Sequence, residues 1–454
     1  MKNLLFVVSL LLSQVAQAQI ELYPMPYGQS PSDIYDVTII DGGRELRSNV
    51  YTDVAEWKTN RCETTSFSSF AASGEVKVRV KTHAQKIDFC QILPRRHEVE
   101  CRIIDDSTVE FTLPGVGQYS VEFEQGIEIT HPLLLFVDDF PVKRPAADMP
   151  DLIVFEEGIH EIGDSFELKS NQTVYLAPGA YVKGQFIARN QRNITITGQG
   201  IMSGEEYPAR SHNHMIAFIG CDNVLVEGIT IINAPRYCVS LGGGMNHICR
   251  NLKMMGWWFS TDGIGLGSNG LIENCFFKVN DDSIKLYRSN TVARNCVIWQ
   301  MENGAPFQIG WNMPGYNSNF HVHDIDIIRV EHPWDNPNEA VFDAIHGSEG
   351  IMAHYLYEDI RIDNCDNRLF HLMTRPNRFG SWNPERGEIR DVTFRNIECY
   401  TQPQRRDIVM GHDERHQVSN VIFENITVDG KRWRSIDDTN FITDPRTTKN
   451  LIVR

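Results

Sequence analysis

The sequence contains no run of lysine and arginine residues. Its 43 basic side chains are outnumbered by 59 acidic ones, which gives a formal net charge of −16 at pH 7. A protein that binds nucleic acid needs a basic patch or stripe along the phosphate backbone, so we expect no nucleic-acid partner. The acidic balance also disfavours a strongly anionic polysaccharide, although a local basic pocket would overrule it.

Long apolar runs are also absent, apart from a short one at the N-terminus. A membrane-spanning helix needs about 20 consecutive apolar residues, and the run from Leu4 to Leu12 is far shorter. Lys2 precedes this run and the small residues of Ala16-Gln17-Ala18 follow it, which is the pattern of a cleavable export signal. The sequence predicts a signal peptide of bacterial style over residues 1–18, and a periplasmic or secreted protein without a membrane span.

The ten cysteines form no CxxC pair and no cluster with histidine, so no zinc site is expected. Several lie inside short apolar segments, where free cysteine behaves as a small buried hydrophobic residue. These are Cys249, Cys275, Cys296, Cys365 and Cys399. Two of the three cysteines of the N-terminal part can form one disulfide, and their spacing does not show which two. The three cysteines are Cys62, Cys90 and Cys101.

Helical periodicity is almost absent from the chain. From residue 19 to about residue 145, apolar and polar residues alternate in short segments between Gly, Pro and Asp turns, as in SGEVKVRVKT and STVEFTL. This alternation is typical of antiparallel strands with one solvated face. We therefore expect a β-sandwich over residues 19–145, ending in the Pro- and Asp-rich stretch VDDFPVKRPAADMPD.

Residues 146–454 contain a loose internal repeat. A turn residue, often Asn, precedes one short strand pattern and a second follows, as in NVLVEGITIINA and NGLIENCFFKVN. The period is about 21 to 34 residues, so each copy is too small to bury its own apolar face and must stack on its neighbours. Coils made only of strands predict an all-β parallel β-helix. Its long insertions, rich in Trp, His, Asn and Arg, wall a groove if they emerge from one side.

Three aspartates stand one repeat apart in the segment STDGIGLGSNGLIENCFFKVNDDSIKLY. Asp262 precedes the adjacent pair Asp281 and Asp282 by 19 and 20 positions. Coils of that length bring the three carboxylates onto neighbouring strands about 4.8 Å apart. Crowded acids repel each other, which raises the pKa of at least one and leaves it protonated. A protonated acid beside ionised ones is suited to acid–base cleavage of a glycosidic bond.

Two other interpretations apply to these acids. TDG and NDD strings are common in turns, because Asp and Asn hydrogen-bond their own backbone. Clustered carboxylates also bind calcium, but the ligand pattern of an EF-hand is absent. The one-coil spacing of the two motifs favours catalysis without a metal or other cofactor. Inversion at the anomeric carbon needs room for water, with acid and base about 6.5–9.5 Å apart.

Side chains near the acids are candidates for sugar binding. Lys285 and Tyr287 alternate with Ile284 and Leu286, so they point outward if the apolar pair is core. We expect Lys285 to balance the charges of the Asp281–Asp282 pair and to bond a sugar hydroxyl, with a surface ion pair as the alternative. The other candidates are three residues for stacking on sugar rings and one neutral hydrogen-bonding residue: Trp257, Trp258, Trp311 and Gln308. Neighbours on a strand face opposite ways, so at least one of the adjacent tryptophans is expected in the core.

TDG, NDDSIKLY, WQ and QIGW, together with LAPGAYVKG at the start of the repeats, resemble glycoside hydrolase family 49, the dextranase and isopullulanase group. The resemblance is sharpest from Gly256 to Trp311 and implies a β-sandwich followed by a right-handed parallel β-helix. It also implies an inverting hydrolase in which Asp281 is the general acid and Asp262 and Asp282 activate water.

More remotely, the sequence resembles the polygalacturonase family, which shares the fold and an NTD plus DD arrangement. That family's GHG turn, and its R-x-K that holds the uronate carboxylate, have no counterpart in the region GAPFQIGW. The departure favours a neutral α-glucan such as dextran or pullulan over a uronate. We accordingly expect a groove without a guanidinium or ammonium fork aimed at a carboxylate.

Several other functions stay open from the sequence. One is a β-helix glycosidase acting on another polysaccharide, such as an α-galactan, a sulfated galactan or polygalacturonate. A lyase would need Lys, Arg or calcium to neutralise a uronate. A non-catalytic carbohydrate-binding β-helix is also compatible with the fold, but a binding module has no need for three acids held together. We expect a monomer whose partner is a polysaccharide or oligosaccharide substrate.

Overall fold

The computed structural model describes residues 18–55, 62–333, 339–378 and 384–454. Regular structure in these ranges is almost entirely β-strand, with two single-turn 3-10 helices, η1 (Arg95–His97) and η2 (Ile436–Asp438). Residues 1–17 of the predicted signal peptide lie outside the described part of the chain. No described helix is long and apolar enough to cross a membrane.

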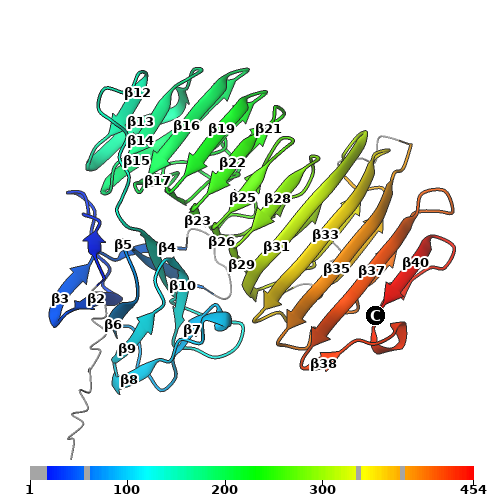
Figure 1. Ribbon diagram of the computed structural model, residues 1–454, viewed down its shortest axis with the longest axis horizontal. Helices are drawn as coiled ribbons and strands as arrows, with labels where there is room; N and C mark the ends of the chain where they lie inside the picture. The colour runs from blue at the N-terminus through cyan, green and yellow to red at the C-terminus, as the bar shows by residue number, and fades with distance from the viewer. Residues whose placement is uncertain (1–17, 56–61, 334–338, 379–383) are drawn as a thin grey trace, which may run out of the picture.

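The N-terminal strands form two packed sheets (Figure 1). The first sheet is antiparallel and contains, in spatial order, β3 (Arg44–Ser48), β2 (Tyr35–Asp41), β6 (Val76–Thr82), β9 (Thr108–Leu113) and β8 (Arg102–Asp105). The second contains β1 (Ile20–Leu22), β5 (Thr64–Ala72), β11 (Leu133–Asp139), β10 (Gly117–Glu122) and β7 (Gln91–Leu93), with β4 (Tyr51–Val54) beside β5. Alternate apolar residues of both sheets fill one shared core, as expected of a sandwich.

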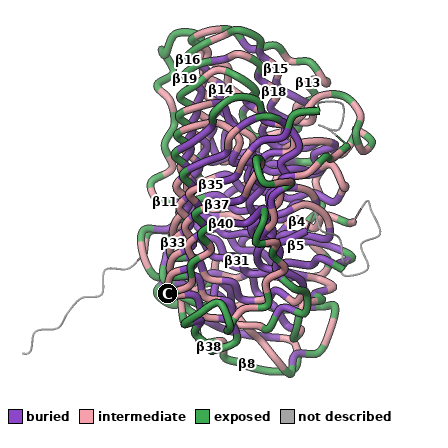
Figure 2. The backbone as a smooth tube through the Cα atoms, turned by 90° about the vertical axis from the view of Figure 1, so that its right-hand side faces the viewer, coloured by how far each residue is buried: buried purple, intermediate pink, exposed green. Residues whose placement is uncertain are grey.

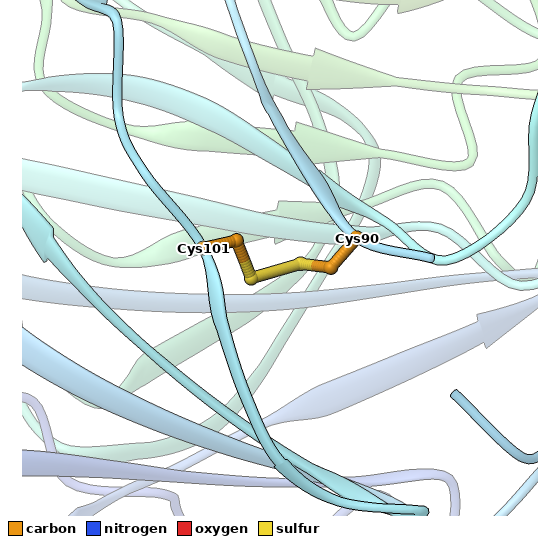
Figure 3. Close-up of a disulfide and its surroundings, with 2 residues drawn as sticks. All are labelled: Cys90 and Cys101. Carbon is orange, nitrogen blue, oxygen red and sulfur yellow. A yellow bond between two sulfur atoms is a disulfide. The ribbon is translucent and has the colours of Figure 1, made fainter. Parts of the chain in front are cut away.

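One pairing in this sandwich differs from the expected antiparallel pattern, because β5 and β11 run parallel. Alternation along a strand reports which face is buried, and it does not report the direction of the neighbouring strand. Cys90 and Cys101 form a disulfide with Cα atoms 6.1 Å apart (Figure 3), which selects one of the pairings left open by the sequence. The other eight cysteines are free and buried.

After β11 the chain enters a second architecture, in which strands of successive coils pair in parallel (Figure 1). The strands form three stacks along one solenoid. The first stack is β12 (Leu152–Phe155), β14 (Thr173–Leu176), β16 (Arg192–Gly198), β19 (Asp222–Glu227), β22 (His247–Arg250), β25 (Leu271–Glu273), β28 (Thr291–Arg294), β31 (Tyr316–Val330), β33 (Ile351–Ile362), β35 (Glu388–Cys399), β37 (Val418–Val428) and β40 (Thr448–Val453).

The second stack is shorter and continues into the C-terminal half of β31. It contains β17 (Ile201–Ser203), β20 (Thr230–Ile232), β23 (Lys253–Met255), β26 (Phe276–Val279) and β29 (Val297–Gln300). The third stack is β13 (Gly158–Glu167), β15 (Ala180–Arg189), β18 (Ile216–Ile219), β21 (Val239–Gly242), β24 (Ile264–Gly265), β27 (Ile284–Lys285), β30 (Phe307–Ile309), β32 (Phe342–His346), β34 (Phe370–Thr374), β36 (Ile408–Met410) and β39 (Ile442–Thr443). A final hairpin strand, β38 (Lys431–Arg432), pairs antiparallel with β37.

The predicted fold class, a β-sandwich followed by a parallel β-helix, is confirmed. Apolar residues from each of the three stacks point into the solenoid and form one continuous core, and Figure 2 shows the buried residues running through its interior. Aromatic side chains on successive coils stack directly inside, as for Phe307, Phe342 and Phe370, whose neighbouring ring centroids lie 5.5 and 5.1 Å apart. The predicted domain boundary at residue 145 falls between β11 and β12.

An asparagine recurs at one corner of successive coils. Seven of these residues have a left-handed backbone with φ between 55° and 70°: Asn171, Asn193, Asn223, Asn246, Asn269, Asn290 and Asn319. From the second onward, each Nδ2 donates a hydrogen bond to the Oδ1 of the previous one at 2.9–3.1 Å. Asn tolerates this conformation better than most residues with a Cβ, so the recurring Asn of the sequence marks the corners of the coils.

The sandwich packs against the second stack of the solenoid (Figure 1). Two buried ion pairs cross this interface: Lys253 Nζ lies 2.5 Å from Asp138 Oδ1, and Arg329 lies 2.6 Å from Glu122. Breaking a buried pair by removing one partner is strongly destabilising, because the other charge is left unpaired. The ion pairs hold β23 and β31 against the sandwich, and Phe276 of β26 packs there on Phe136. β26 ends two residues before Asp281, and a loop runs from β23 to Asp262.

The asparagine row makes a prediction about stability. Asn269→Ala removes one ladder bond on each side and places alanine at φ 58°, so we expect it to lower the free energy of unfolding by about 1–3 kcal/mol. Asn269→Gly loses the same bonds without the backbone strain and should cost less. Thermal unfolding followed by circular dichroism compares the two. An Ala variant as stable as wild type would contradict the role of the row.

Candidate active site

The three candidate acids lie at one corner of the coils, between the second and third stacks. Asp262 stands between β23 and β24, and Asp281 and Asp282 stand between β26 and β27. Ile264 pairs in register with Ile284, so Asp262 and Asp282, each two residues earlier, occupy the same place on adjacent coils. One oxygen of each carboxylate lies within 4.8 Å of the others. The structure thus brings together three acids that are separated by up to 20 positions in the chain.

Lys285 contacts two of the three carboxylates. Its Nζ lies 2.7 Å from Asp262 Oδ2 and also donates to Asp282 Oδ2, and all three side chains are buried. The sequence predicted that Lys285 balances the charges of Asp281 and Asp282; it contacts Asp282 and, through its charge, opposes the rise that burial causes in the pKa of Asp281. The contact with Asp262 was not predicted. The difference arises because Lys285 pairs in register with Gly265, which brings its side chain over the coil that carries Asp262.

Burial and neighbouring charges raise the pKa values of Asp262 and Asp281. Burial raises the pKa of Asp262 to about 7, with Lys285 opposing the rise and Asp282 adding to it. The pKa of Asp281 is raised well above its usual value by burial, and then by the charges of Asp262 and Asp282. Burial lowers the pKa of Lys285, but the two carboxylates outweigh it and raise this pKa well above normal. Asp281 is therefore suited to carry a proton, beside carboxylates that contact an ammonium.

The same three acids have the spacing of a cation site. Carboxylate oxygens are the ligands that calcium and magnesium prefer. Lys285, however, already brings a positive charge that is bonded to two of the three groups. The arrangement therefore favours proton transfer over the binding of a divalent cation.

The acids open into a cleft of about 1050 Å³. Of the predicted sugar-binding residues, Lys285, Tyr287 and Trp311 line it. Ile284 and Leu286 lie in the core of the solenoid, so the predicted alternation along β27 holds. Aromatic walls of this kind suit sugar rings, which present apolar faces between polar edges.

Three other predicted residues do not line the cleft. Trp257 is buried at the interface with the sandwich, where its Nε1 donates to Asp53 Oδ2 at 2.8 Å. Gln308 is fully buried in the third stack, and its Nε2 donates to Asp343 Oδ2 at 2.6 Å. Trp258 is half-buried and lies outside the cleft wall. We therefore propose none of these three as a substrate contact.

The guanidinium groups of the cleft wall were not predicted from the sequence. The cleft wall carries Arg210, Arg236, Arg375 and Arg378. The sequence argument considered an arginine only after the acid pair, at the place of the R-x-K motif. In a solenoid, each coil has an earlier coil on one side and a later coil on the other. A cleft over several coils is therefore lined by residues that lie both before and after the acids in the chain.

A row of polar residues from earlier coils was also missed by sequence reasoning. Ile216, Val239, Ile264 and Ile284 pair in register on four successive coils. The residues two positions earlier on each coil are His214, Tyr237, Asp262 and Asp282, and the rings of the first two lie 4.5 Å apart. Counting back one coil of about 25 residues from Asp262 would have found Tyr237.

A glycine of the next coil closes the site. Gly304 has φ 80°, and a Cβ placed there would lie 2.4 Å from the backbone of Asp281 and Asp282. Only a residue without a side chain lets the following coil pass this close to the acid pair. The neighbouring Asn303 lines the cleft, and its backbone N–H donates to Asn280 Oδ1 at 3.1 Å.

Comparisons with known proteins agree with this geometry. A sequence model described as glycosyl hydrolases family 28 matches residues 180–447. The chain belongs to this family. It is a glycoside hydrolase, and the predicted remote resemblance to polygalacturonase-like hydrolases is thereby confirmed.

Relatives also include members of the dextranase and isopullulanase group. A dextranase of Arthrobacter globiformis is 24% identical, over 90% of this chain and 81% of its own. An isopullulanase of Aspergillus niger is 24% identical, over 69% of this chain and 64% of its own. The solved structure of Dex49A from Penicillium minioluteum superimposes with a TM-score of 0.78 at 17% identity and covers 96% of both chains. The predicted resemblance to this group is confirmed.

Replacing Lys285 tests how the acids share their charge. The ammonium lowers the pKa of Asp262, so Lys285→Met should raise that pKa above about 7. If Asp262 must be ionised to act as a base, the acidic limb of the profile of kcat/KM against pH then moves to higher pH. Lys253→Met is the matched control, because Lys253 is an equally buried, paired lysine at the domain interface. An unshifted acidic limb in folded Lys285→Met would contradict this coupling.

Proposed function

We propose that the protein hydrolyses an α-glucan, with Asp281 as the general acid and with Asp262 and Asp282 activating water. The observation that carries this proposal is the difference between the carboxyl groups. Asp281 forms no ion pair with a described residue and is poised to keep a proton, whereas the other two contact one ammonium. Pairs of titratable groups whose surroundings separate their pKa values mark the acid and base of a site.

In the proposed reaction the Asp281 proton passes to the glycosidic oxygen as the bond to the anomeric carbon breaks. Water attacks that carbon, and one of its protons passes to Asp262 or Asp282. The products are two shorter sugars, one with a new reducing end. Positive charge develops on the sugar in the transition state, and nearby carboxylates stabilise it more strongly in a closed cleft than in water.

The spacing of the carboxylates bears on whether the anomeric configuration is inverted or retained. One oxygen of each carboxylate lies within 4.8 Å of the others, which is closer than the about 6.5–9.5 Å usual between the acid and base of inverting enzymes. A nucleophile, however, needs one ionised carboxylate aimed at the anomeric carbon. Here Lys285 holds the two other carboxylates together, an arrangement that suits a shared water. We therefore favour inversion.

The substrate assignment rests on the relatives and on the site. The relatives named above are dextranases and an isopullulanase. The sugars on either side of the scissile bond should be uncharged, because an anion there would meet three acids at short range. A neutral α-glucan such as dextran or pullulan satisfies this requirement. The N-terminal export pattern supports a periplasmic or secreted site of action, where such polymers are met, and a monomer suffices for the chemistry.

The acid assignment predicts a large loss on substitution. Asp281→Asn removes the proton donor while keeping size and shape, so hydrolysis of dextran should fall by at least about a hundredfold. Released reducing sugar measures the rate, and circular dichroism confirms the fold. Asp139→Asn, which changes an exposed aspartate of the sandwich, is the control. Activity near that of wild type in folded Asp281→Asn would remove the central assignment.

The anomeric configuration of the first product tests the second part of the mechanism. Proton NMR of a fresh digest should show the β-anomer before mutarotation, because inversion of an α-linkage gives a β-product. An α-anomer at early time would indicate a covalent intermediate. Asp262 or Asp282 would then be the nucleophile, and the shared-water model would be wrong.

A further inference from the structure

The wall of the cleft before the acids carries two arginines that bind no carboxylate of the described residues. Arg210 Nη2 donates to the carbonyl of Phe259 at 3.2 Å, and Arg236 Nη2 donates to the carbonyl of Arg210. The Nε of Arg236 is buried and has no hydrogen-bond partner in the described part of the chain. Uncharged carbonyls thus hold these guanidinium groups in place without neutralising them.

Arginines without a carboxylate partner are unexpected in a protein with an excess of acidic residues. Acidic residues outnumber basic ones by 16, and many other arginines of the described ranges lie in ion pairs, such as Arg294 with Glu273. Guanidinium groups without a carboxylate partner, on the wall of a cleft, are donors held ready for an anion.

The histidine beside them adds a further donor. The backbone N–H of Tyr237 donates to His214 Nδ1 at 3.2 Å, so the neutral ring carries its proton on Nε2. Burial, then Arg236 and Lys285, lowers the pKa of His214 to about 4, which keeps the ring neutral. The groups on this side of the cleft therefore donate hydrogen bonds, whereas the acids accept them.

The backbone at Arg210 is also in an uncommon conformation. Its φ is 60°, in the left-handed region that few residues with a Cβ adopt. Its N–H donates to the carbonyl of Pro235 at 2.8 Å, which ties this loop to the coil of Arg236. Strained backbone of this kind gathers where a side chain must be held for binding.

Register places Arg236 at a distance from the proposed general acid. Arg236 stands three residues before Val239, as Asp281 stands three before Ile284, and these two strand positions are two coils apart. Two coil spacings correspond to about 10 Å, and the coil between them carries Asp262. A charged group can therefore sit by the arginines while the scissile sugar lies uncharged at the acids.

We infer that Arg210, Arg236 and His214 form a subsite for an anionic substituent, a sulfate ester or a carboxylate, on a sugar away from the scissile bond. The inference rests on the proposed glycan hydrolysis for its setting and adds a second recognition element to that cleft. Such a subsite explains why a protein with a net negative charge has arginines on the wall of its cleft. The alternative is that the arginines donate to neutral hydroxyl groups, in which case an anion gains nothing.

Direct binding separates these alternatives without relying on turnover. The probes are dextran, lightly sulfated dextran and lightly carboxymethylated dextran of matched length, measured by titration calorimetry with the Asp281→Asn variant so that no probe is degraded. We expect at least one anionic probe to bind about tenfold or more tightly than dextran. The two anionic arms show which oxyanion the subsite takes.

Substitutions then locate the effect. Arg210→Gln, at an exposed residue, and the double variant with Arg236→Gln should remove most of the preference for the anionic probe and leave dextran binding nearly unchanged. Arg192→Gln removes the same charge from an exposed position on β16 and should change nothing. Equal binding of all three probes, or a preference that survives Arg210→Gln with Arg236→Gln, would overturn the subsite. Failure of the wild type to cleave any α-glucan would overturn the proposed function and leave this result standing.

Discussion

The parallel register of successive coils is the constraint on which the site depends. Ile264 lies against Ile284, and this single pairing places Asp262 and Asp282 one strand spacing apart, about 4.8 Å. A coil longer or shorter by one residue would turn one of the two carboxylates away. The asparagine row fixes the corner of each coil independently of the apolar core. The acids are therefore held by backbone hydrogen bonds between coils, so that the catalytic geometry is a property of the stack.

The sandwich contributes to this geometry from outside the solenoid. Asp53, on β4, accepts the Nε1–H of Trp257 at 2.8 Å, and the carbonyl of Trp257 accepts from Asn280 Nδ2 at 2.7 Å. Asn280 directly precedes Asp281, and Trp257 opens the loop that reaches Asp262. One carboxylate of the sandwich thus ties together the two loops that carry the acids. Trp257, a candidate for stacking on sugar, serves instead as the link in this chain.

Much of this arrangement could be predicted from the sequence, because its signals are periodic. The alternation of the N-terminal strands, the recurring Asn and the 20-residue spacing of the acids each reflect a local rule of strands and turns. What could not be predicted depends on which loops meet across coils. Arg210 lies far before the acids in the chain and Arg378 far after them, yet both line the cleft. Gln308 follows a strand pattern like that of Lys285 but donates to Asp343. The alternation of apolar and polar residues shows which face of a strand is buried. Which residues pack on that face depends on segments far away in the chain.

The acids and the arginines of the cleft carry opposite charges that suit different roles. When Asp281 holds the proton and the two carboxylates bonded to Lys285 act as bases, this group carries one net negative charge, which stabilises positive charge developing on the sugar. A second cation beside the acids would cancel this stabilisation. An anionic substituent beside them would be repelled, since like charges a few ångströms apart in a poorly solvated cleft interact strongly. Guanidinium groups in this cleft are therefore useful only at a distance from the reacting bond. Two coil spacings separate Arg236 from Asp281, and this distance keeps the recognition of charge apart from the proton donor.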